Sequence, residues 1–244
     1  MYIKNKHNPS QAVYVWSRYL RLFHWLNVLA IMLLIGFGLV IFNASNLGVS
    51  TEGKVLLKTL HVIVGYVFAT NLFIRIVMGF VGKGYERWRN TLPFTKGFGA
   101  ELANIKKQAH IRHKGHNPLG KLMVAALLLA MCVQMISGLV IAGTDIYYPP
   151  LGQYFANYIA LDKSQLELVK PYSTVNVDEQ AYQTMREIRA PFIAAHVYAF
   201  YAFLILIPLH IIGVVFSERR EKTALVSAMI TGYKYLPEEN KKSE

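Results

Sequence analysis

The feature that most constrains this chain is an apolar run, Ala190–Ser217, that carries two histidines. As a helix, the run is long enough to cross the hydrocarbon core of a bilayer. Tyrosines aside, its only ionisable side chains are those of His196 and His210. Fourteen helical residues separate these imidazoles by roughly 21 Å along the axis and bring them to within about 40° of one direction. Hydrogen bonding inside a bundle would explain either histidine alone, but the pair on one face favours two sites.

Four runs of the sequence can span a membrane. Of the 244 residues, 54% are hydrophobic and only 16% are charged, and the mean hydropathy is +0.30. This composition excludes an ordinary soluble domain. We expect an all-α membrane protein, a four-transmembrane-helix bundle formed by residues 1–217 and followed by a cytoplasmic tail, 218–244. The expected spans are 22–42, 60–81, 119–143 and 191–216.

The basic residues are distributed unevenly between the connections. The net charge is +12, and 20 of the 26 lysines and arginines lie in the N-terminal segment, in the stretch 75–121 or after residue 218. The positive-inside rule then places both termini and the loop 82–118 in the cytoplasm, with the bacterial inner (plasma) membrane as the natural setting. The first run lacks a small-residue cleavage site, so we expect a retained helix. The basic excess indicates contact with anionic lipids and no nucleic-acid partner.

Cysteine and histidine usage narrows the possible cofactors. Cys132 is the only cysteine, which excludes an internal disulfide and an iron–sulfur cluster, and the absence of CxxCH excludes covalent c-type haem. The loop histidines His110, His113 and His116 lie among basic residues without a neighbouring cysteine, which favours a solvated surface over a metal site. In GHNPLGK, Asn117 is expected to cap a helix that begins at Pro118.

The membrane histidines pair by depth. His61 and His196 fall on the outer side, and His24 and His210 fall on the inner side. Each pair could supply both axial ligands of one haem b, an arrangement that favours electron transfer over oxygen binding. We therefore expect two haems b in the interior of the bundle. Interfacial placement is the alternative for His24 alone.

Small and polar residues in the runs admit two interpretations. Gly36 and Gly38 permit close approach of a neighbouring helix or a flat ligand. Gly65, one turn after His61, either leaves room for a porphyrin edge or serves helix packing. Gln134 and Ser137 are expected to bond to neighbouring helices.

Two hydrophilic segments remain. Connections as long as 144–190 are uncommon unless they have a function of their own. This one is either a docking surface for an extracytoplasmic partner or a plain connector. Its end, NVDEQAYQTMREIR, is expected to form a short amphipathic helix. TALVSAMITGYKY, at 223–235, is weakly amphipathic and is expected to lie along the inner membrane surface.

The order of motifs resembles a known family. RLFHW, HVIVG, FIRIVMGFVG, GHNPLGKLM, the H-x13-H spacing and MITGYKY together resemble the bacterial cytochrome b-561 family, and most closely its branch of b-type cytochrome subunits of membrane-bound nickel–iron hydrogenases. The resemblance covers nearly the whole chain. It implies two haems b on the four histidines, and a subunit that anchors a periplasmic oxidoreductase and exchanges electrons with quinone.

The leading hypothesis is therefore an electron-transfer subunit of a respiratory complex. Its partners would be a periplasmic oxidoreductase or a cytochrome c, and menaquinone or ubiquinone in the membrane. Arg21, Arg75 and Asn117 are the candidate contacts for quinone or a haem propionate. Alternatives are a stand-alone superoxide:quinone oxidoreductase, a cytochrome b subunit of a formate dehydrogenase or thiosulfate reductase, and a non-redox anchor whose histidines merely pack.

Overall fold

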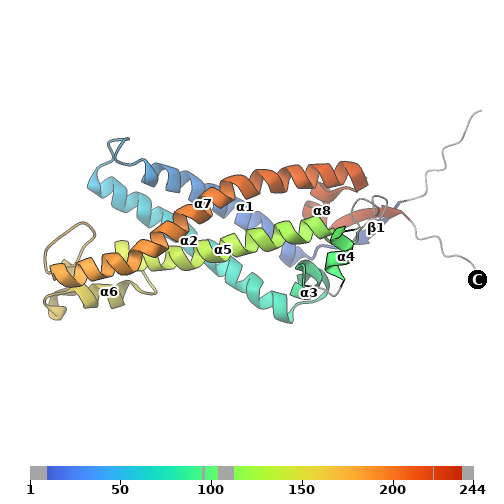
Figure 1. The fold of residues 1–244 in the computed structure, drawn as a ribbon. Helices are drawn as coiled ribbons and strands as arrows, with labels where there is room; N and C mark the ends of the chain where they lie inside the picture. Colours follow the sequence, from blue (N-terminus) through green and yellow to red (C-terminus); the bar gives the residue numbers. More distant parts are fainter. Residues whose placement is uncertain (1–9, 95–96, 104–112, 222, 238–244) are drawn as a thin grey trace, which may run out of the picture. The chain divides into compact units, whose positions relative to one another are not determined.

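Four long helices form most of the chain. The computed structural model describes residues 10–94, 97–103, 113–221 and 223–237. The long helices are α1 (Arg18–Phe42), α2 (Thr51–Val81), α5 (Pro118–Asp145) and α7 (Glu179–Glu221) (Figure 1). Each is long and apolar enough to cross a membrane, and each contains one of the four expected spans. The prediction of an all-α membrane protein with four transmembrane helices is confirmed.

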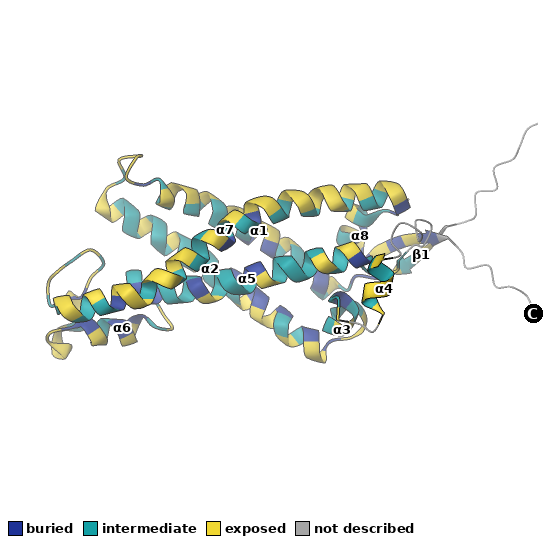
Figure 2. Ribbon diagram, viewed as in Figure 1, coloured by how far each residue is buried: buried dark blue, intermediate teal, exposed yellow. Residues whose placement is uncertain are grey.

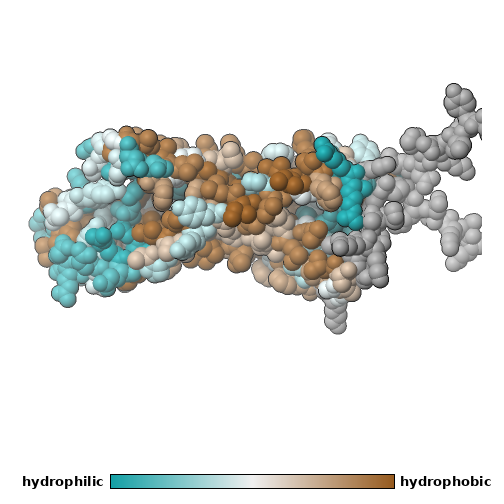
Figure 3. All heavy atoms as spheres, turned by 45° about the horizontal axis from the view of Figure 1, so that its top comes forward, coloured by the Kyte–Doolittle hydropathy of each residue, from teal (hydrophilic) through white to brown (hydrophobic). Residues whose placement is uncertain are grey.

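The long helices each contribute to two compact units. Unit 1 comprises Met1–His24, Ile76–Ala126 and Leu206–Glu244, and unit 2 comprises Trp25–Arg75 and Leu127–Ile205. Large apolar side chains are exposed along the long helices in both units (Figure 2). Such extensive exposed apolar surface is expected where helices face lipid. In Figure 3, hydrophilic side chains instead gather at the end where α6 lies.

Side-chain caps fix where three long helices begin. The Ser50 hydroxyl accepts a bond of 3.1 Å from the Gly53 amide ahead of α2, and Asp178 accepts one of 2.8 Å from the Ala181 amide ahead of α7. The Asn117 side chain accepts a 2.8 Å bond from the Gly120 amide, and α5 begins at Pro118. These bonds satisfy amides that have no partner inside the helix. The cap predicted at Asn117 is confirmed.

The connection between α5 and α7 has a hydrophobic core of its own, in unit 2. It contains α6 (Gly152–Ile159) and η2 (Lys163–Leu168), and Figure 1 shows α6 beside the start of α7. Phe155 and Ile159 pack with Val169 and with Met185 of α7, and both Ile159 and Met185 are fully buried. The separate amphipathic helix expected before the last span is wrong: α7 is continuous from Glu179, because Met185 and its neighbours continue the helix onto this core.

Unit 1 contains a two-stranded ribbon that joins the two ends of the described chain. Strand β1 (Ser10–Tyr14) pairs antiparallel with β2 (Tyr233–Pro237). Short helices complete the unit: η1 (Gly84–Glu86), α3 (Trp88–Thr91), α4 (Phe98–Ala103) and α8 (Leu225–Thr231). The weakly amphipathic segment 223–235, expected at the inner membrane surface, contains both α8 and most of β2. The helix stops at Gly232, whose φ of 91° is left-handed, and the remainder is a strand.

Candidate functional site

The inner histidine pair lies within unit 1. His24 of α1 and His210 of α7 are both half-buried, and their ring centroids are 6.5 Å apart with an interplanar angle of 50°. The two residues are 186 positions apart in sequence, so the tertiary fold brings them together. Arg21, one turn before His24, donates through Nη1 to the main-chain oxygen of Ile230 in α8.

The outer histidine pair lies within unit 2. The rings of His61, from α2, and His196, from α7, have centroids 6.3 Å apart and an interplanar angle of 63°. The hydroxyl of Ser137, from α5, lies 3.0 Å from Nδ1 of His196. Nδ1 of His61 is buried and has no hydrogen-bond partner among the described residues. The two imidazoles therefore differ in their surroundings although they face each other.

A cavity of about 250 Å³ surrounds the outer pair and has walls from α1, α2, α5 and α7. Its lining is mostly apolar, and glycines from three helices contribute to it: Gly38, Gly65 and Gly138. A Cβ at Gly138 would lie 3.3 Å from Cε1 of His196, and one at Gly38 would lie 3.6 Å from Cε1 of His61, whereas one at Gly65 would meet nothing within 4 Å. Gly65 therefore borders open space, as the interpretation of a porphyrin edge requires.

Gly36 does not belong to this arrangement. It is exposed, and a Cβ built there would meet no atom within 4 Å. No neighbouring helix in the described chain closely approaches Gly36, contrary to that expectation, and of Gly36 and Gly38 only Gly38 lines the cavity.

The spacing of both pairs suits a metal held between two imidazoles. Metal–imidazole bonds of about 2 Å on opposite sides of one ion place two ring centroids about 6 Å apart. The observed spacings are 6.5 and 6.3 Å. Among the described residues no three His, Cys, Asp or Glu side chains gather into a metal-binding cluster, so the remaining ligands of such an ion would have to come from a cofactor. Two facing imidazoles and, at the outer pair, an apolar cavity fit an iron porphyrin.

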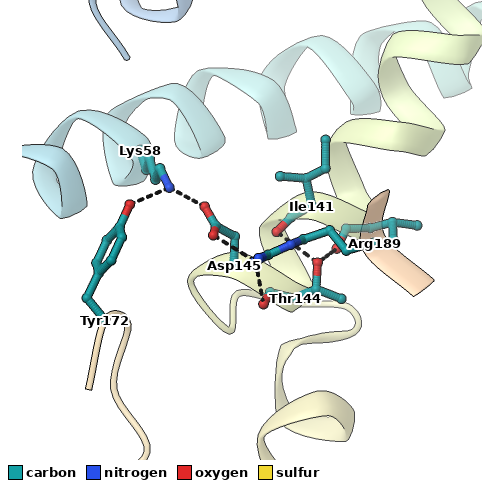
Figure 4. A network of polar contacts seen from close by, with 7 residues as sticks. Lys58, Ile141, Thr144, Asp145, Tyr172 and Arg189 are labelled. Carbon is teal, nitrogen blue, oxygen red and sulfur yellow. Dashed lines mark hydrogen bonds and ion pairs between the residues drawn. The ribbon is translucent and has the colours of Figure 1, made fainter. Parts of the chain in front are cut away.

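A charged network forms one end of the cavity (Figure 4). Lys58 and Asp145 both line the cavity and form an ion pair. Lys58 also donates to the Tyr172 hydroxyl at 2.6 Å, and Arg189 donates to Asp145 at 2.8 Å. Two cations thus share one carboxylate beside the histidine pair. Sequence reasoning missed Lys58, although its position three residues before His61 places both side chains on one helix face.

The three candidate contacts for quinone or propionate belong to two different units. Arg21 and Asn117 belong to unit 1, and Arg75 belongs to unit 2, where it is buried. The Asn117 amide nitrogen donates to Ser217 at 3.3 Å and to Glu221 at 3.0 Å, in addition to the cap described above. Asn117 therefore joins the start of α5 to the end of α7.

The loop histidines take part in packing within unit 1. The ring of His116 lies 4.8 Å from that of Trp16, centroid to centroid. The main-chain oxygen of His113 accepts a 2.7 Å bond from Lys234, which is almost fully buried. Burial lowers the pKa of the His113 imidazole and that of the Lys234 ammonium. His110 lies outside the described residues.

Comparison with known proteins agrees with this chemistry. The family model described as prokaryotic cytochrome b561 matches residues 15–232. A similar curated protein is the probable Ni/Fe-hydrogenase B-type cytochrome subunit of Cupriavidus necator, which is 27% identical over 52% of this chain and 56% of its own length. The chain thus matches little more than half of that relative. No solved structure matches the chain.

Proposed function

Because the chain belongs to the prokaryotic cytochrome b561 family of b-type haem membrane proteins, we propose that it is a dihaem subunit that carries electrons between a periplasmic oxidoreductase and membrane quinone. The observation that best supports this proposal is that four imidazoles form two facing pairs. Their ring centroids are 6.5 and 6.3 Å apart. Four histidines from three helices form two similar sets, and α7 contributes one residue to each. A non-redox anchor has no need of two such sets.

At the outer site, His61 and His196 would hold the iron through one nitrogen each. Gly38, Gly65 and Gly138 line the cavity without side chains, which would leave room for a macrocycle. Lys58 stands at the charged end of the cavity, where an ammonium suits a propionate. When bound, a haem with two axial imidazoles supplies one-electron transfer with no open position for oxygen.

At the inner site, His24 and His210 would hold the second haem. Arg21 lies one turn from His24, and its buried Nε has no partner among the described residues, which makes it the candidate contact for a quinone carbonyl. Arg75 and Asn117 remain weaker candidates. The Asn117 side chain already forms hydrogen bonds within the chain. Electrons would enter at the outer pair and leave to menaquinone or ubiquinone near the inner pair.

The folded connection before α7 would meet the partner enzyme. Within residues 146–178, Phe155 and Ile159 of α6 face its core, while Tyr154, Tyr158 and Leu161 are exposed. A connection with its own core can present such a surface in a fixed conformation. The name of the Cupriavidus necator relative makes a hydrogenase-like enzyme the first partner to test. Both termini would lie in the cytoplasm and the connection outside it, in a bacterial inner membrane.

Haem counting tests the proposal. The purified wild-type protein should bind two haems b per chain by pyridine haemochrome assay and show a b-type redox difference spectrum. His61→Ala and His210→Ala should each reduce the count to one, because each removes one axial ligand from a different pair. His116→Ala is a matched control outside the long apolar helices and should retain two. Fewer than two haems in the wild type, or an unchanged count in His210→Ala, would contradict the assignment.

A further inference from the structure

The hydroxyl of Ser137 makes three polar contacts in the interior of unit 2, of which the one to the main-chain oxygen of Gln134 is the longest, at 3.3 Å. Ser137 is 2% exposed. Its Oγ lies 2.6 Å from the main-chain oxygen of Val133, one turn earlier in α5, and 3.0 Å from Nδ1 of His196. A hydroxyl carries one hydrogen and two acceptor sites, so these contacts constrain where the protons lie.

The shortest contact decides the direction of the bonds to Val133 and His196. Two oxygens 2.6 Å apart repel each other unless a proton lies between them, and the carbonyl oxygen of Val133 can only accept. The Ser137 hydroxyl therefore donates to Val133, and its lone pair is available to His196. The contact at 3.0 Å then requires that Nδ1 of His196 carries the proton. In neutral imidazole this leaves the lone pair on Nε2, the nitrogen a metal would need.

The imidazole of His61, which faces that of His196, has no comparable hydrogen bond at Nδ1 among the described residues. This Nδ1 is buried, while a Cβ at Gly38 would only touch Cε1 of the same ring. The two members of the outer pair therefore differ: His196 meets the Ser137 hydroxyl and the main chain of Gln134, whereas Nδ1 of His61 has no acceptor in the described part of the chain. An acceptor on the second nitrogen fixes the tautomer of a ligating histidine and raises its basicity.

We propose that Ser137 is a positioning residue that holds His196 in its Nδ1–H tautomer and lowers the reduction potential of the haem at this pair. The inference depends on the proposed function, since it concerns a bound haem. The mechanism is electrostatic: a more basic axial nitrogen stabilises ferric iron more than ferrous iron. Ser137 acts only through His196 and does not touch the iron.

Potentiometric titration of the Ser137→Ala variant tests the proposal. Loss of one hydrogen bond to the ligand should change the reduction equilibrium of the outer haem five- to tenfold, which raises its midpoint potential by about 40 to 60 mV for one electron. The potential of the inner haem should not change. Ser137→Thr, which keeps the hydroxyl, should restore the wild-type value. Repeating Ser137→Ala in the His210→Ala background assigns the shift to the outer haem.

Thr144 provides a matched control in the same helix. Its hydroxyl donates to the main-chain oxygen of Val140 at 2.8 Å, one turn earlier, and the residue is 1% exposed. Thr144→Val removes a buried hydroxyl that makes the same kind of local bond but no hydrogen bond to a histidine among the described residues, so both potentials should remain unchanged. Two haems in Ser137→Ala with wild-type potentials, or an equal shift in Thr144→Val, would overturn the role of Ser137. Absence of haem from the wild type would instead overturn the proposed function.

Discussion

At the scale of single residues, the outer cavity depends on glycines, which have no side chain to fill it. Gly65 lines the outer cavity, and the space beside its Cα is open. Gly36, in α1, is exposed and does not line the cavity. The two glycines are alike in lacking any neighbour within 4 Å of an added Cβ. They differ only in where a larger side chain would go, which makes them a matched pair.

The Gly65→Leu variant should therefore lose the outer haem and keep the inner one. A leucine at this position would occupy space that the macrocycle needs, and helix propensity favours leucine over glycine, so the helix itself should be retained. We expect the pyridine haemochrome count to fall from two per chain to one. Gly36→Leu should retain two. Equal counts in the two variants would show that the cavity beside Gly65 is not the haem site.

The combination of histidines was predictable from sequence because the depth of each residue in its helix depends on local geometry. Depth in a helix follows from counting residues, and this gave both pairs in their observed combinations. The contact between Ser137 and His196 was not predictable. Ser137 was expected to bond to a neighbouring helix, and this is confirmed, but the identity of its partner depends on how α5 and α7 are rotated about their axes.

At the scale of elements, the ribbon in unit 1 depends on one left-handed residue. Gly232 ends α8 with φ 91°, and its main-chain oxygen accepts bonds from the Val15 and Trp16 amides at 2.9 and 3.2 Å. A Cβ there would lie 2.6 Å from a ring carbon of Tyr14. Glycine is thus needed for both its conformation and its size.

Gly232→Ala should open the ribbon without unfolding the long helices. A left-handed alanine costs about 1–2 kcal/mol, and the contact with Tyr14 adds to this. Since about 1.4 kcal/mol is a factor of ten in an equilibrium, the Val15 and Trp16 amides should exchange hydrogen about tenfold faster or more. Gly99→Ala, on an exposed position in α4 with no atom within 4 Å, is the control. Unchanged protection in Gly232→Ala would show that the ribbon tolerates a side chain here.

The elements that sequence reasoning missed are those that depend on distant partners. Strands β1 and β2 pair residues more than two hundred positions apart, and neither strand has a pattern that identifies the other. Likewise, the charged start of α7 shows no apolar run, and Met185 is buried only because α6 packs on it. The apolar spans and the Asn117 cap, by contrast, are encoded within a few turns of sequence.

At the scale of the whole molecule, four crossings return the chain to the side on which it began. Both termini and residues 82–117 would then share one side, with residues 43–50 and 146–178 on the other. Twenty of the 26 basic residues fall in the first group or at its helix ends. By the positive-inside rule that group would lie in the cytoplasm, and the inner histidine pair would lie near that side.

Cysteine labelling tests this orientation. Because the chain has a single native cysteine, one substitution removes the background labelling. In a Cys132→Ala background, Ser164→Cys and Lys83→Cys each place one thiol at an exposed position, in η2 and directly before η1 respectively. In right-side-out membrane vesicles an impermeant maleimide should modify residue 164 at once, and residue 83 only after permeabilisation. The reverse pattern would invert the protein and place His24 and His210 on the outer side. Immediate labelling of both would mean an even number of crossings between them, contrary to the four-helix topology, in which α5 alone crosses between residues 83 and 164.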